Sequence, residues 1–167
     1  MEGEAALQIL AEVSVALAGF TGVVGAFGDR RSSWTPFEFL RFRVMLGTSL
    51  ATLLLSLLPF ALYHLHLAPG VIWILCSAAY AAYLVTIFPL DVRRGRALGL
   101  FEHPDYRAWV PLVLGGSVAV AVALQVLNVA GVGFHREPGP FILGLFLLVV
   151  ICAFMFVRLL AFVGRDE

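Results

Sequence analysis

Glu12 is the single charged residue in an apolar run that covers about residues 5–27. If this run spans a membrane, its carboxyl group lies roughly 10 Å below the entry of the helix. Ionisable side chains at such depth are costly and usually face the bundle interior or a wet cavity. We therefore expect Glu12 to face inward. One hypothesis is that it contacts a proton, a cation or a ligand. The alternative, which we favour, is a protonated or interface-snorkelling carboxyl group that is hydrogen-bonded to a neighbouring helix.

The residues that share a helix face with Glu12 support this inward orientation. At about 100° per residue, that face is polar in its first half and small in its second half, as expected of a packed face. Its members are Ala5, Gln8, Glu12, Ala16, Gly19, Val23 and Ala26.

Other polar residues fall at a similar depth near the ends of other apolar runs. Gln125 and Asn128 are spaced i,i+3 in a Val/Ala/Leu-rich segment, and His64 and His66 lie at the end of the second run. The chain topology predicts one candidate polar site on this side of the membrane, formed by Gln8, Glu12, His64, His66, Gln125, Asn128 and His135, with Glu137 beside them. The alternative is that helix ends are polar near headgroups and that amides join helices.

Metal binding and catalysis find little support in the residue pattern. His64 and His66, with His135 and Glu12, are ligand types that suit zinc or copper, but positions i and i+2 point to different sides of a helix. We find no cysteine pair, His-Glu-x-x-His, glycine-rich phosphate loop or Gly-x-Ser-x-Gly motif. The isolated cysteines Cys76 and Cys152 are typical of small buried hydrophobes. We therefore assign no catalytic residue, no metal and no cofactor.

A polar segment at residues 91–107 carries Arg93, Arg94, Arg96 and Arg107. We expect it to form a cytoplasmic basic loop. One interpretation is an active site acting on lipid, or a clamp for phospholipid headgroups. The other is an arginine cluster that sets membrane topology, followed by Asp105 as the N-cap of the next helix.

The composition indicates the elements that must position these residues. The chain has 167 residues, of which 61% are hydrophobic and 13% charged, and its mean hydropathy is +0.97. Soluble domains have about 25% charged residues, so a soluble enzyme, a nucleic-acid binder and a disordered chain are excluded. Because about 20 apolar residues span a bilayer, we predict an all-α integral membrane protein, a bundle of five transmembrane helices in a single domain, 1–167.

The predicted spans lie at about 5–27, 44–67, 71–90, 108–130 and 140–163. The helix of the second span is expected to begin near residue 36, well before the apolar core. Thr35 as N-cap, Pro36 as the first helical residue and Glu38 three residues after the cap form the pattern of a capping box.

The arginines predict the orientation. With five spans, ten of the eleven basic residues, all of them arginine, fall on one side of the membrane, and only Arg136 falls on the other. The positive-inside rule then places the N-terminus outside and the C-terminus in the cytoplasm. The bilayer is thus the first expected partner, and nucleic acid is not one.

Our functional hypothesis is a small multi-pass inner-membrane protein that works by association, as an accessory subunit or a homo-oligomer. The alternative is an oligomeric small transporter or channel that uses Glu12 and the polar groups on the outer side. A third hypothesis is a membrane enzyme that acts on lipid from the 91–107 segment.

Overall fold

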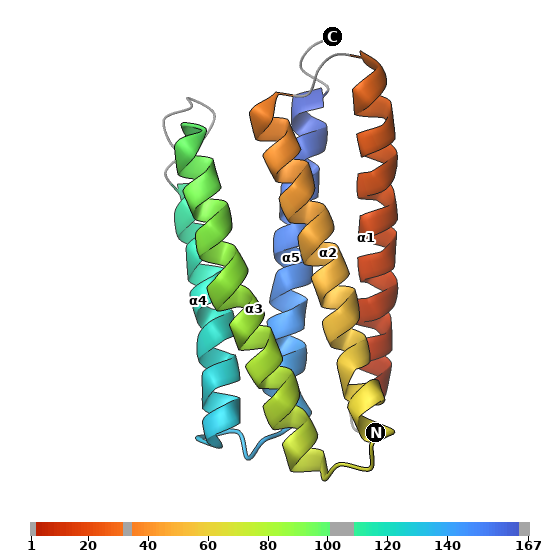
Figure 1. Ribbon diagram of the computed structural model, residues 1–167, viewed down its shortest axis with the longest axis vertical. Helices are drawn as coiled ribbons and strands as arrows, with labels where there is room; N and C mark the ends of the chain where they lie inside the picture. The colour runs from red at the N-terminus through yellow and green to blue at the C-terminus, as the bar shows by residue number, and fades with distance from the viewer. Residues whose placement is uncertain (1–2, 32–34, 101–108, 164–167) are drawn as a thin grey trace.

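The computed structural model describes residues 3–31, 35–100 and 109–163, and in these ranges the regular structure is helical. The five helices are α1 (Glu4–Arg31), α2 (Pro36–Tyr63), α3 (Pro69–Ala97), α4 (Trp109–Ala130) and α5 (Pro138–Val163). They run alternately up and down along a common axis, so α1, α3 and α5 finish at the same end, where α2 and α4 begin (Figure 1).

Each of the five helices contains a stretch long and apolar enough to cross a membrane. Only hydrogen-bonded helices or closed barrels satisfy the backbone inside lipid, and long apolar helices are what the composition predicted. The all-α fold with five candidate spans is therefore confirmed for the part of the chain that the structure describes.

The start of α2 follows the predicted capping box. The Glu38 backbone N–H donates to Thr35 Oγ1 at 3.3 Å, and the Thr35 backbone N–H donates to Glu38 Oε2 at 2.8 Å. These two bonds satisfy amides that would otherwise lack partners in the first helical turn. Residues 36–43 are helical, as predicted, and extend α2 beyond its apolar part.

Two predicted boundaries are wrong. The third helix does not stop at Pro89 but continues to Ala97, with Pro89 inside it. Prolines are tolerated inside membrane helices, and the Asp91–Arg94 salt bridge (3.2 Å, i,i+3) supports the extra turns. The second helix ends at Tyr63 instead of near residue 67, because His66 adopts a left-handed backbone conformation (φ 57°) that no helix continues.

The two ends of the bundle differ in charge. We call the end where α1, α3 and α5 finish the Arg-rich end, and the opposite end the far end (Figure 1). The described arginine side chains near the Arg-rich end are Arg41, Arg43, Arg93, Arg94, Arg96 and Arg158, whereas Arg136 lies in the turn at the far end. Arg107 and Arg165 lie outside the described residues.

The main apolar core occupies the far half of the bundle. It joins residues of all five helices, including Leu7, Ile72, Ala121 and Phe141. The Tyr80 ring stands edge-on to the Phe141 ring, with centroids 6.1 Å apart. A smaller cluster toward the Arg-rich end joins α1, α2 and α5 around Met45 and Cys152. Helix α1 packs chiefly against α2, and α3 chiefly against α4.

Candidate functional site

Glu12 faces away from the bundle, so the prediction that it faces inward is wrong. Its side chain is exposed, and Gln8 Nε2 donates to its Oε1 at 3.3 Å, one turn away on the same helix. Every other member of the predicted inward face is also exposed: Ala5, Gln8, Ala16, Gly19, Val23 and Ala26.

The buried face of α1 consists of other residues. Leu7, Leu10 and Ala11 are buried in its first half, followed by Ser14 and Thr21, whose hydroxyls donate to backbone carbonyls one turn earlier. The larger leucine side chains fill the space against α2 and α5 better than the small and polar face does. The polar face of α1 is therefore left on the outside of a single chain.

Gln125 and Asn128 are fully buried and join three helices. Gln125 Nε2 donates to the Pro140 carbonyl at 3.0 Å, and Asn128 Nδ2 donates to Ser77 Oγ at 3.0 Å and to the Glu137 carbonyl at 3.1 Å. Gln125 thus holds α4 against the first turn of α5, and Asn128 holds α4 against α3 and against the residue before α5. This geometry matches the structural interpretation, in which amides join helices.

The histidines lie in turns between helices and not on the helices that carry Glu12 and the buried amides. His64 and His66 are exposed at the turn between α2 and α3, and His135 is exposed in the turn between α4 and α5. Among the described residues, no group of three His, Cys, Asp or Glu side chains is placed to hold a metal ion.

The predicted polar site is therefore not one site in this chain. Gln8 and Glu12 lie on the outside of α1, the amide pair lies between α3, α4 and α5, and the histidines lie in exposed turns. These residues lie toward the far end, but depth along the bundle does not determine the direction in which each side chain points.

Three arginines of the predicted basic loop lie on a helix instead. Arg93, Arg94 and Arg96 belong to the last turns of α3, and the Arg94 guanidinium pairs with Asp91. Arg107 and the proposed N-cap Asp105 lie outside the described residues. Because α3 is longer than predicted, these arginines lie on the side of the helical bundle and not in a separate loop.

A cavity of about 330 Å³ is the feature that the sequence pattern did not indicate. It lies in the half of the bundle next to the Arg-rich end, between the first turns of α2, the last turns of α3, and α4 and α5. Leu84, Leu114, Leu148 and Ile151 are among its apolar walls. Arg41, Asp91 and Arg96 line it at the Arg-rich end.

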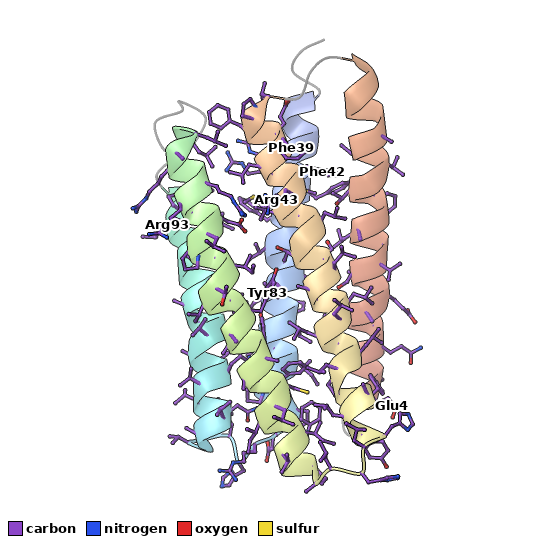
Figure 2. All side chains as sticks on the ribbon, in the orientation of Figure 1. Glu4, Phe39, Phe42, Arg43, Tyr83 and Arg93 are labelled. Carbon is purple, nitrogen blue, oxygen red and sulfur yellow. The ribbon has the colours of Figure 1, made fainter. Side chains whose placement is uncertain are left out.

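Two hydroxyl groups lie deeper along the same cavity. Tyr83, about midway along α3 (Figure 2), and Thr48 of α2 both line it, and their side chains interact with each other. Beside this wall, Ser49 Oγ and Cys152 Sγ are 3.0 Å apart and join α2 to α5. The cavity is thus mostly apolar, with hydroxyls in its interior and charged groups at one end.

Comparison of the chain with protein-family models, characterised proteins and solved structures found no match. The functional argument therefore depends on the geometry of this chain.

Proposed function

We propose that the protein is a non-catalytic multi-pass inner-membrane protein that works by association, and that the outer face of α1 is its contact surface. The observation that carries this proposal is the exposed Gln8–Glu12 pair on a helix apolar enough to span a membrane.

A carboxyl group at membrane depth is stabilised by polar partners from another helix or by water in a cavity. Within the described part of the chain, Glu12 accepts a hydrogen bond from Gln8 of the same helix. A second helix packed on this face would shield both groups from lipid. A second copy of the chain is the simplest such helix, since it brings a further Gln8 amide to each Glu12 carboxyl.

The rest of the same face suits close helix packing. Ala16 and Gly19 follow Glu12 at successive turns and are exposed, and a Cβ added at Gly19 would meet nothing within 4 Å. Small residues let membrane helices approach closely. By contrast, Gly25 is already used inside the chain, because a Cβ there would lie 2.7 Å from the Phe42 ring of α2.

The proposal includes an orientation. The arginines gather near one end of the bundle, and the positive-inside rule assigns that end to the cytoplasm. The N-terminus is then outside and the C-terminus inside, and Glu12 lies in the outer half of the bilayer.

Energy transfer between two fluorescently labelled populations of the chain in liposomes tests association. We expect concentration-dependent transfer that Gly19→Leu weakens on the order of tenfold, because a bulky side chain at a close helix contact separates the helices. Gly47→Leu is the matched control, since Gly47 is exposed on α2 and a Cβ there also meets nothing within 4 Å. Equal transfer in both variants would contradict the role of α1.

A second candidate, an oligomeric small transporter or channel, is favoured by the same exposed carboxyl group. Because Gln125 and Asn128 are buried between helices, the path would have to be lined by Gln8 and Glu12 of α1 from several copies. Proton or cation flux in liposomes separates the two candidates. Flux that is lost in Glu12→Gln while association persists would favour the transporter.

A further inference from the structure

The cavity next to the Arg-rich end has the shape and chemistry of a binding site for an amphiphile. Its volume of about 330 Å³ lies within the range of about 300–1,000 Å³ that is typical of ligand pockets. Its walls come from four helices. Helix α1 contributes no residue to its lining, so the cavity is separate from the outer face of α1.

The packing of the bundle explains why a cavity forms here. The main core joins α3 and α4 to the other helices around Tyr80, Leu145 and Phe141, in the far half of the bundle. Toward the Arg-rich end, the smaller cluster around Met45 and Cys152 includes α1, α2 and α5 but no residue of α3 or α4. The pair α3–α4 is therefore less tightly joined to the other helices at this level.

The cavity extends along the axes of the helices that line it. It is lined by α3 residues from Tyr83 to Arg96 and by α2 residues from Leu40 to Thr48. At 1.5 Å per residue, the α3 wall extends about 20 Å along the helix. An extended hydrocarbon chain lying parallel to the helices fits such a space.

The charges at the end of the cavity select the headgroup. The lining residues carry two arginines, Arg41 and Arg96, against one carboxylate, Asp91, which is paired with Arg94 at 3.2 Å. Among the described lining residues, guanidinium groups therefore outnumber carboxylates two to one at the level where a lipid headgroup would lie. Guanidinium groups bind phosphate oxygens through paired hydrogen bonds, and basic pockets between membrane helices bind anionic headgroups.

We propose that this cavity binds one anionic phospholipid, with an acyl chain between α3 and α2 and the phosphate at Arg41 and Arg96. The proposal does not depend on self-association through α1, and its test is made on the full chain in detergent.

Native mass spectrometry of the full chain can measure the bound lipid. The protein is equilibrated with equal amounts of phosphatidylglycerol and phosphatidylcholine that carry the same acyl chains, and the retained lipids are counted. We expect one phosphatidylglycerol per chain in preference to phosphatidylcholine. The Arg41→Gln/Arg96→Gln double variant should retain it on the order of tenfold less, whereas the two lysine replacements should preserve part of the binding.

The chain offers a matched control for general surface charge. Arg43 and Arg93 lie near the same end (Figure 2), are exposed and do not line the cavity. Arg43→Gln/Arg93→Gln removes the same charge and should bind as the unchanged chain does. Equal loss in both double variants would overturn the proposal in favour of diffuse attraction to the surface.

A cavity-filling variant tests the acyl chain separately. Val118→Phe places a ring in the α4 wall and leaves both arginines in place, so it should also lose the lipid. Equal retention of the two lipids by the unchanged chain would overturn the headgroup assignment. Displacement of the lipid by glycerol phosphate alone would overturn the acyl-chain assignment. If the glutamine variants do not fold, the lysine and Val118→Phe variants decide the question.

Discussion

The Tyr80 hydroxyl on α3 donates a 2.7 Å hydrogen bond to the Gly144 carbonyl on α5, although 64 residues separate the two. The approach is possible because residue 144 has no side chain. A Cβ there would lie 2.6 Å from Tyr80 Cε1 and 2.5 Å from Gln125 Nε2. Three helices thus meet at one glycine in the far half of the bundle.

Gly144→Ala is expected to destabilise the bundle by about 1–3 kcal/mol, the usual cost of overpacking a filled core. Gly139→Ala, at the start of the same helix, is the control, because a Cβ there meets nothing within 4 Å. Unfolding of both variants in mixed micelles measures the difference in free energy. Equal stability of the two would show that α5 shifts freely at this point.

Asn128 and Ser77 should be coupled energetically through their 3.0 Å hydrogen bond. Side-chain hydrogen bonds between membrane helices contribute about 0.6 kcal/mol on average and up to about 1.7. A double-mutant cycle with Asn128→Ala and Ser77→Ala should give a coupling energy in this range, since both groups are buried. Strictly additive effects would contradict a direct bond between the two side chains.

The fold was largely predictable, because each helix carries its own signal. Apolar length indicated five spans, and the Thr35 capping box located the start of α2 to the residue. The end of α3 was missed because Pro89 and the charged residues after it are typical of a helix end in a soluble protein. In a membrane helix neither feature is sufficient, and the Asp91–Arg94 pair supports continued helix.

The direction in which the candidate-site side chains point could not be predicted from the sequence. Glu12 was assigned inward on the rule that membrane carboxyl groups face the bundle, yet Leu7 and Leu10 occupy that position. The rule applies to helices in a complete assembly, and the sequence of one chain does not show which helix faces contact another chain. The cavity near Arg41 and Arg96 depends on how residues of α2, α3, α4 and α5 are arranged around it, which no local pattern encodes.

Thr35→Ala should loosen the first turn of α2. Loss of an N-cap side chain costs about 1 kcal/mol, and here it removes the oxygen that accepts from the Glu38 backbone N–H. Hydrogen exchange of the backbone amides in residues 37–39 should accelerate about fivefold, since local opening governs the rate. Thr35→Ser retains the hydroxyl and should exchange as the unchanged chain does. Equal acceleration in both variants would contradict capping by this oxygen.

The proposed orientation predicts which cysteines a membrane-impermeant maleimide reaches in intact cells. His66→Cys lies in the turn at the far end and should be labelled from outside, whereas Arg93→Cys lies near the Arg-rich end and should be labelled only after lysis. Both positions are exposed, so accessibility differs only by the side of the membrane. The native Cys76 and Cys152 are 0% and 2% exposed and should contribute little background. Labelling of Arg93→Cys but not of His66→Cys in intact cells would reverse the orientation, and it would place Glu12 in the inner half of the bilayer.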